Sequence, residues 1–366
     1  MSDRSPRFSR AVYGALGALV VAALVFVLIS AFRTSSHVER GAALFRMKFT
    51  PEQGLGPLFN GQACSSCHRE PEVGGVGRGG LATALRAGRL TDAGFDPLIG
   101  RGGPLARAHS VSELGVACDL EPGIPAGANV TSVRNAPSLF GTSAVDAIAE
   151  SAIRAGVAER RDGVSGRPNL VRGPDGRERV GRFGWKADTP TLEQFVAEAL
   201  RGELGVTSLL APEDLAGRAR CPGASAEPEA GADVVQALTA FVASLPAPAP
   251  RGLREPEGKA VFEATGCGAC HVAVLGRAPL YSDLLLHDMG RALDDGFVQG
   301  VARGPEWRTA PLWGLSDRTR YLHDGRAATL EAAIVAHGGE AAGAVRRYAA
   351  LPDAERRALL AFLRAL

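Results

Sequence analysis

Two short boxes of the form Cys-x-x-Cys-His constrain this chain more than any other feature: Cys64-Ser-Ser-Cys67-His68 and Cys267-Gly-Ala-Cys270-His271. This spacing is typical of c-type haem attachment, in which both thiols bond the haem vinyl groups and the histidine ligates the iron. A thioredoxin-like dithiol does not need a histidine directly after its second cysteine, yet both boxes have one. A tetrahedral zinc site needs four ligands close together, whereas these boxes lie about 200 residues apart. We therefore expect two covalently attached c-type haems, whose redox chemistry no side chain supplies.

The N-terminal region contains an apolar segment, residues 11–32, that carries no charge. Twenty-two helical residues span about 33 Å, which is enough to cross a bilayer. Arg4, Arg7 and Arg10 precede the segment, so residues 1–10 are expected to stay in the cytoplasm. The alternative is a cleaved signal peptide, but no clean small-x-small cleavage site precedes Arg33. We favour an uncleaved anchor in the inner membrane, and either reading places the rest of the chain on the periplasmic side.

Composition adds two constraints. The chain has 366 residues, enough for two domains with sizeable cores, and its net charge of +2 gives no sign of a nucleic-acid partner. Two cysteines, Cys118 and Cys221, lie outside the boxes. An even number of remaining cysteines in an exported protein favours a disulfide between them, and two separate thiols are the alternative.

Past the predicted anchor, the chain reads as two unequal copies of one unit. Each copy opens with a Gly-x-Ala-x-Phe pattern before its haem box, and later motifs recur in the same order. The matching segments are 41–45 and 258–262, 134–141 and 308–314, 191–193 and 329–331, and 237–245 and 358–366. The first copy, residues 33–245, carries insertions. A Pro-rich linker, residues 246–256, separates it from the second copy, residues 257–366, which is the size of a small cytochrome c.

The expected fold is mainly α: two cytochrome c-like haem domains in tandem with long loops, after one N-terminal transmembrane helix. Apolar residues at helical spacing predict helices over residues 233–245 and 353–366, the second with Asp353 as its N-cap. Helices over residues 191–200 and 329–337 each begin with a threonine cap. Gly-rich stretches such as residues 74–80 and 163–176 predict loops, and no long β-alternation is present.

Several long segments resemble the di-haem oxidoreductase family, some members of which are labelled thiol oxidoreductases. This family is related to bacterial di-haem cytochrome c peroxidases. The matching segments are residues 54–60, 163–169, 181–187, 281–290, 306–315 and 322–327. The resemblance covers most of the chain after the anchor and implies an oxidoreductase with two haems.

The second copy holds the candidates for a sixth ligand to the iron of its haem. The peroxidase pattern places that ligand fourteen residues beyond the histidine of a Tyr-x-His-x-Gly turn. Here the turn contains His323, and the ligand position is His337. The related peroxidases usually have methionine there, and imidazole in its place lowers the reduction potential. Met289 is the alternative ligand. In the simplest interpretation, His337 is a surface histidine at a helix end and ligates no iron.

The first copy lacks the equivalent ligand. Aligning Thr329 with Thr191 sets His337 opposite Ala199, and a methyl group cannot bind iron. An iron with an open position binds peroxide or dioxygen, whereas a closed one only relays electrons. The resemblance likewise implies that the first haem is the reactive one. His109 is a candidate ligand that would occupy the open position on the first iron.

The resemblance implies further roles. Glu203 falls where the peroxidases place an acid, which would move a proton between the peroxide oxygens; Glu198 is the alternative. Trp185 resembles an inter-haem tryptophan. Arg134 and Arg308 recur at matching positions, and a forked guanidinium suits a haem propionate. The related peroxidases bind calcium between domains, but no acidic cluster here argues for it.

These features favour a membrane-tethered, peroxidase-like oxidoreductase. Electrons would enter at the second haem, pass near Trp185 and reduce a small oxidant such as hydrogen peroxide at the first haem. The expected donor is a small cytochrome, a cupredoxin or the quinol chain. The alternatives are a pure electron-transfer cytochrome with two six-coordinate irons, and a di-haem enzyme that oxidises a partner protein.

Overall fold

The computed structural model describes residues 35–157, 163–213, 221, 228–251 and 256–366. The predicted cytoplasmic N-terminus and membrane anchor lie outside these residues, as does part of the predicted linker. Among the helices that the structure describes, none is long and apolar enough to cross a membrane.

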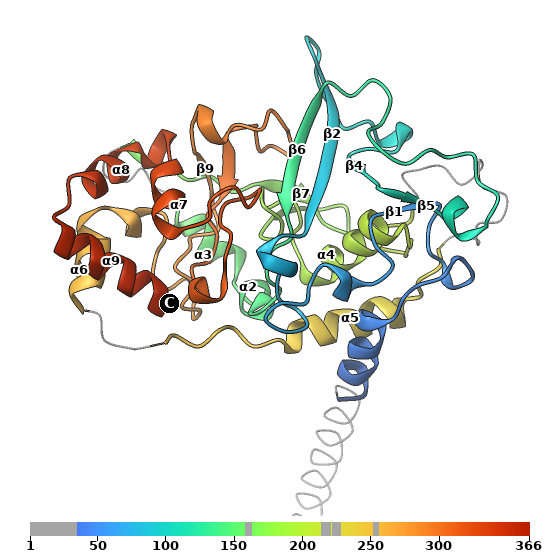
Figure 1. The fold of residues 1–366 in the computed structure, drawn as a ribbon, viewed down its shortest axis with the longest axis horizontal. Helices are drawn as coiled ribbons and strands as arrows, with labels where there is room; N and C mark the ends of the chain where they lie inside the picture. Colours follow the sequence, from blue (N-terminus) through green and yellow to red (C-terminus); the bar gives the residue numbers. More distant parts are fainter. Residues whose placement is uncertain (1–34, 158–162, 214–220, 222–227, 252–255) are drawn as a thin grey trace, which may run out of the picture.

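The helices fall into two groups along the chain (Figure 1). Residues 35–46 form the first helix that is described, and it lies beside α5 in the first copy. The other described helices of the first copy are the short helices α2 Thr142–Asp146, α3 Glu150–Ala155 and α4 Leu192–Ala199, and the longer α5 Ala232–Ser244. The second copy contains α6 Pro256–Ala264, α7 Leu330–Ala336, α8 Ala342–Ala349 and α9 Asp353–Ala365.

The two copies repeat one helix crossing. A Cβ atom added at Gly41 would lie 1.9 Å from the carbonyl oxygen of Ala237 in α5, and one added at Gly258 would lie 2.2 Å from that of Ala358 in α9. Only glycine lets the two backbones approach so closely. Beside each crossing, a phenylalanine pair packs with ring centroids 5.1 Å apart in the first copy and 5.4 Å apart in the second. The sequence repeat is thus matched by a repeated packing arrangement.

Strands contribute more than the sequence predicted. Strand β2, Thr83–Thr91, pairs antiparallel along most of its length with β6, Val130–Asn135, and these two strands rise through the middle of the molecule (Figure 1). β2 also pairs antiparallel with β3, Gly94–Asp96, and with β4, Leu105–Ala106. No sequence pattern indicated β2, because this strand does not bury alternate residues and contains Gly88, so the absence of long β-alternation did not mean the absence of a long strand. The remaining described strands are β1 Leu58–Phe59, β5 His109–Ser110, β7 Leu170–Arg172, β8 Glu178–Val180, β9 Leu286–Asp288 and β10 Glu306–Arg308.

Local expectations are mostly confirmed at the helix ends. Thr191 and Thr329 both cap their helices, each accepting a hydrogen bond from a backbone amide of the first turn. The predicted cap at Asp353 is one residue too late: Pro352 is the N-cap, and Asp353 lies in the first turn, where its charge suits the helix dipole. The glycine-rich stretch of residues 163–176 contains β7 and is therefore not entirely a loop.

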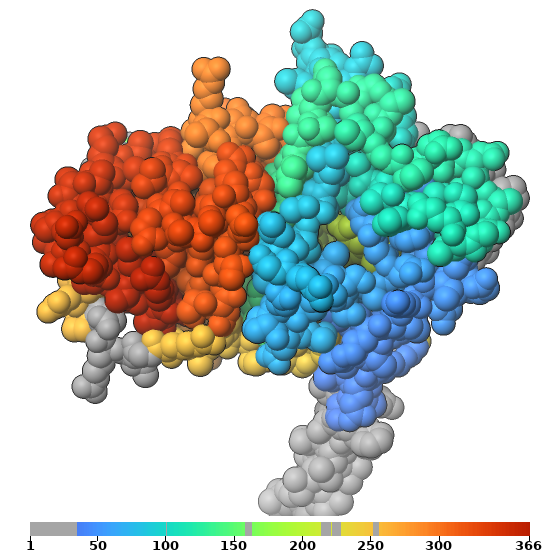
Figure 2. All heavy atoms as spheres, viewed as in Figure 1, coloured from blue at the N-terminus to red at the C-terminus, as the bar shows by residue number. Residues whose placement is uncertain are grey.

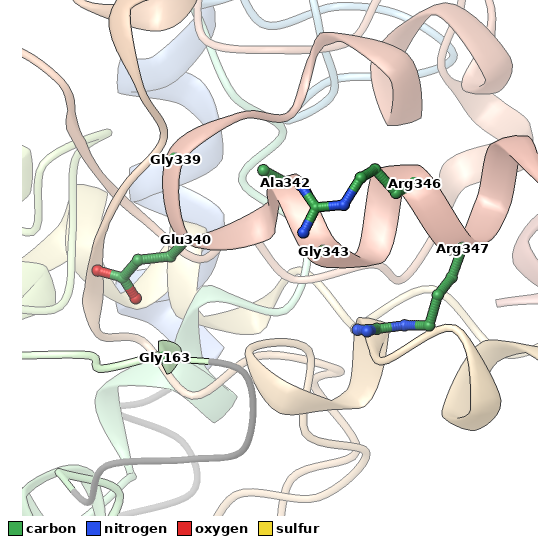
Figure 3. A pocket seen from close by; sticks show the side chains of 7 residues that line it. All are labelled: Gly163, Gly339, Glu340, Ala342, Gly343, Arg346 and Arg347. Atoms are coloured by element: carbon green, nitrogen blue, oxygen red, sulfur yellow. The ribbon is translucent and has the colours of Figure 1, made fainter.

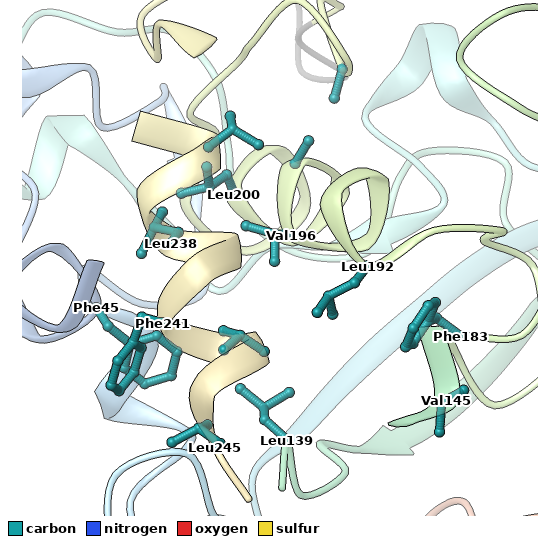
Figure 4. Close-up of a cluster of buried hydrophobic side chains, with 14 of the residues drawn as sticks. Phe45, Leu139, Val145, Phe183, Leu192, Val196, Leu200, Leu238, Phe241 and Leu245 are labelled. Atoms are coloured by element: carbon teal, nitrogen blue, oxygen red, sulfur yellow. The ribbon is translucent and has the colours of Figure 1, made fainter. Parts of the chain in front are cut away.

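Two main hydrophobic clusters match the two copies. The larger cluster gathers around α4 and α5 and includes Phe45, Leu192, Leu238 and Phe241 (Figure 4). It also takes in a few residues of the second copy, whereas the smaller cluster is built by residues of α6, α7 and α9 with their neighbours. A disulfide joins Cys118 to Cys221, and the four cysteines of the Cys-x-x-Cys-His boxes are free.

Candidate haem sites

Both Cys-x-x-Cys-His boxes fold into the same turn. In the first box, η2 Cys64–Ser66 is followed by a hydrogen bond of 3.1 Å from the His68 amide to the Cys64 carbonyl oxygen. In the second, η9 Cys267–Ala269 is followed by the equivalent bond of 3.0 Å from the His271 amide. The turn holds two thiols and an imidazole together in each copy, as the sequence pattern predicts.

Three histidines share one hydrogen-bonding arrangement. The Nδ1 atoms of His68, His271 and His337 lie 3.0, 2.8 and 2.7 Å from the backbone carbonyl oxygens of Gly75, Tyr281 and Ala333. Each Nδ1 therefore carries the hydrogen, and each Nε2 keeps its lone pair. Burial lowers the pKa of all three rings, that of His271 to about 4, so they are neutral at pH 7. A neutral imidazole fixed through one nitrogen is the form that ligates a metal.

A cavity of about 770 Å³ opens in the second copy. Cys267, Cys270 and His271 line it from one direction, and His337 and Met289 also contribute to its wall. The other lining residues are mostly apolar. His337 is close enough to His271 that protonation of one ring opposes protonation of the other, which adds to the burial that lowers the His271 pKa. The structure thus brings the box histidine and both candidate sixth ligands to one cavity.

The first copy differs at the matching position. Helix α7 ends at His337, whose backbone is extended, whereas α4 continues past Ala199 into a π-helical turn, η7 Leu200–Leu204. Single π turns often mark functional sites. This turn carries Glu203, so the segment that provides a histidine in the second copy provides a carboxyl group in the first. Figure 2 shows a hollow in this part of the first copy, with the α4–η7 segment visible inside.

Glu203 lies beside the first box. Burial raises the pKa of the Cys67 thiol, and the negative charge of ionised Glu203 raises it further. The carboxyl group therefore lies near that cysteine. The Asn60 amide Nδ2 donates to Glu203 Oε2 at 2.8 Å, and Asn60 Oδ1 accepts from the Ala108 amide at 2.9 Å. Burial raises the pKa of Glu203 above its usual range, which favours the protonated acid. The alternative acid, Glu198, accepts hydrogen bonds from Thr189 and Gln194.

Trp185 lines the cavity of the second copy although it belongs to the first. Its indole Nε1 donates to the carbonyl oxygen of Asn135 at 2.8 Å, and the Asn135 amide donates to the His323 carbonyl at 2.7 Å. Asn135 therefore connects Trp185 to His323. His323 is buried and stacks on Trp307, with ring centroids 3.7 Å apart and planes 11° apart.

The two matching arginines have different surroundings. Arg308 lines the cavity, its Nε donates to the Gly184 carbonyl, and burial lowers its pKa to about 10. Arg134 does not line that cavity: it pairs with Asp295 at 2.5 Å and its guanidinium lies 4.4 Å from the centroid of the Trp307 ring. Binding of a haem propionate remains a prediction for both, and the surroundings favour Arg308.

Two other histidines are held by carboxylates. His287 lies between Asp283 and Glu340, and although burial opposes it, hydrogen bonding to Asp283 raises the His287 pKa to about 11. His109 pairs with Glu113 at 3.0 Å on an exposed segment. Glu340 also borders a surface pocket with Arg346 and Arg347 (Figure 3).

Comparison with known families decides the class of protein. Residues 127–366, well over half of the chain, match the family described as "Di-haem oxidoreductase, putative peroxidase". The chain belongs to the di-haem oxidoreductase family. It is therefore an enzyme of haem peroxidase-like type, and the family implies two haems. No curated protein sequence matches the chain.

Several solved structures are similar to this di-haem oxidoreductase. The diheme peroxidase BthA from Burkholderia thailandensis is 17% identical, with 90% of this chain and 86% of that chain covered and a TM-score of 0.44. A hydrazine synthase from Kuenenia stuttgartiensis is 16% identical, covering 91% and 88%, also with a TM-score of 0.44. A MauG-like protein associated with microbial copper homeostasis is 18% identical, covering 90% and 89%, with a TM-score of 0.44.

The residues present fit the two haems of the family. Each box offers two free thiols and a neutral imidazole, and the second copy adds an apolar cavity with His337 on its wall. Divalent metal is a different matter. The part of the chain that the structure describes contains no group of three or more His, Cys, Asp or Glu residues that could hold a metal ion.

Sequence reasoning missed three residues that shape these sites. Asn60 holds Glu203, Trp307 stacks on His323, and the half-buried Arg318 lines the cavity of the second copy. Asn60 and Trp307 lie in segments that resemble the family, which was the available signal. Their contacts join residues far apart in the chain, so the sequence alone did not assign them roles.

Proposed function

We propose that this di-haem oxidoreductase is a peroxidase-like enzyme whose two haem sites have different roles. The second site transfers electrons, and the first keeps an open position for a small oxidant such as hydrogen peroxide. The observation that carries the proposal is the difference between matched helices: His337 ends α7, whereas Ala199 stands opposite it in α4 and the chain continues to Glu203.

The haems would be held covalently. Cys64 and Cys67 would bond one haem, with His68 as its ligand, and the second box would hold the other. His271 and His337 would both ligate the iron of the second haem, with Met289 as the alternative to His337. When bound, the two haems supply electron transfer and an iron at which an oxidant is reduced.

Glu203 would serve the first site as a proton carrier. Burial raises its pKa, which favours the protonated acid, and the Asn60 amide fixes its orientation. Proton transfer by a positioned acid of this kind contributes roughly 100- to 10,000-fold in rate. Arg86 and Arg107 lie near enough for their charges to oppose the rise in pKa.

Trp185 would carry electrons from the second site to the first. It comes from the first copy, lines the cavity of the second, and has its indole fixed by Asn135. The electron donor would be a small cytochrome, a cupredoxin or the quinol chain. We further propose that residues 11–32 anchor the enzyme in the inner membrane with both haem sites on the periplasmic side.

Two measurements test the proposal. Haem staining of the denatured protein is expected to show covalent haem, with about half the stain left in a Cys267→Ala/Cys270→Ala variant; loss of all stain on denaturation would rule out c-type attachment. Hydrogen peroxide added to the reduced protein is expected to reoxidise both haems. A protein that relays electrons but leaves peroxide unconsumed would be a pure electron-transfer cytochrome.

A further inference from the structure

The Lys186 side chain is fully buried where the two copies meet. Its ammonium nitrogen donates to three backbone carbonyl oxygens of the second copy, those of Arg303, Gly304 and Glu306, at 2.7, 2.8 and 3.0 Å. A carboxylate oxygen of Asp295 lies 3.3 Å away. Four oxygen atoms from 295–306 therefore surround one positive charge that the first copy supplies. We call them the oxygen cage.

The oxygen cage is built for a cation. The Arg303 carbonyl also accepts from the Glu306 amide at 3.1 Å, but buried carbonyl oxygens turned toward one point still need a positive charge or a donor there. The Asp295 carboxylate adds a negative charge, and it is shared with Arg134. The Trp307 ring, whose centroid lies 4.2 Å from the ammonium nitrogen, offers its electron-rich face to the same charge.

The size and charge of the oxygen cage indicate which cation it suits. Its oxygen atoms lie 2.7 to 3.3 Å from the nitrogen, longer than the roughly 2.3–2.6 Å of calcium or 2.0–2.1 Å of magnesium. We propose that the cage is a binding site for a monovalent cation of the ammonium type, and that this chain fills it permanently with its own Lys186. The contact between the copies would therefore need no free divalent ion, whereas the related peroxidases bind calcium between domains.

This contact positions the cavity wall. The carbonyls of the cage belong to β10 and the loop before it, and β10 carries Trp307 and Arg308. Lys186 follows Trp185 in the chain, and the Arg308 amide donates to the Trp185 carbonyl at 3.0 Å. Lys186 is thus a positioning residue, which keeps a tryptophan of the first copy in register with a strand of the second.

Chemical rescue tests the proposal on the full-length, haem-loaded protein. Lys186→Ala removes a propylammonium group from the cage. We expect its thermal unfolding midpoint to fall by roughly 5–10 °C, because the buried Asp295 charge loses a partner. Propylammonium chloride is expected to restore much of the loss, and tetramethylammonium chloride, which has no N–H donors, is not. A Lys186→Met control fills the space with apolar atoms and is expected not to respond. The proposal is overturned if propylammonium stabilises the alanine variant no more than tetramethylammonium does.

The wild-type protein gives a second test that does not depend on the variants folding. Its unfolding midpoint is expected to be the same in EDTA and in calcium chloride. A midpoint that falls in EDTA and recovers with calcium would show that a divalent ion holds the copies together, and would overturn the proposal.

Discussion

His271 and His337 line one cavity and keep the same nitrogen atom, Nε2, without a hydrogen-bond partner among the described residues. One histidine comes from a Cys-x-x-Cys-His turn and the other from the end of α7. Both are neutral because burial lowers their pKa values. Among the described residues of the first copy, His68 alone has this form, and the carboxyl group of Glu203 lies nearby. This asymmetry between two repeated units underlies the predictions below.

Glu203→Gln is expected to reduce peroxide turnover by roughly 100-fold or more, because the variant cannot move a proton. Glutamine keeps an oxygen that accepts from Asn60, so both haems are expected to stay bound. The measurement is steady-state peroxide consumption with a chemical electron donor. Glu198→Gln is the matched control and is expected to be close to wild type; the opposite ranking would move the acid to Glu198.

Stability is expected to depend on pH through the same residue. Burial raises the pKa of Glu203 above 4.5 in the folded protein, so the folded state binds the proton more tightly than the unfolded state does. The resulting stabilisation is present below the unfolded pKa and is lost as pH rises through the folded pKa. Glu203→Gln is therefore expected to raise the unfolding midpoint at pH 8 relative to wild type, and to raise it less at pH 4. A difference independent of pH would contradict this account.

Trp185→Phe is expected to slow electron passage between the haems by roughly tenfold or more, about 1.4 kcal/mol in the barrier. Phenylalanine is harder to oxidise than tryptophan and cannot donate to Asn135. Stopped-flow absorbance after peroxide addition reports the rate. Trp313→Phe, a change at a buried tryptophan that does not itself line the cavity, is the control. Equal rates in the two variants would remove Trp185 from the electron path.

The disulfide between Cys118 and Cys221 closes a loop of sequence separation 103. Replacing both cysteines with serine is expected to lower the free energy of unfolding by about 2–5 kcal/mol, because the unfolded chain gains freedom. Denaturant unfolding followed by circular dichroism measures the change. Wild-type protein treated with a mild reductant should move the same way, whereas no change in either sample would show that the bond is not structural.

Local patterns allowed much of the candidate site to be predicted. The haem boxes, both threonine caps and the difference between His337 and Ala199 are properties of short segments and of their repetition. The β2–β6 pairing was missed because β2 lacks strict alternation of buried residues. The cage around Lys186 was missed for another reason: its oxygen atoms belong to the backbone, and no residue type signals them.

The most direct test of the asymmetry is ferric electron paramagnetic resonance of the haem-loaded protein and its His337→Ala variant. The wild type is expected to show one low-spin and one high-spin haem, and the variant is expected to lose the low-spin signal, with Met289→Leu unchanged as the control. Two low-spin haems in the wild type, or a low-spin signal that survives His337→Ala, would contradict the account.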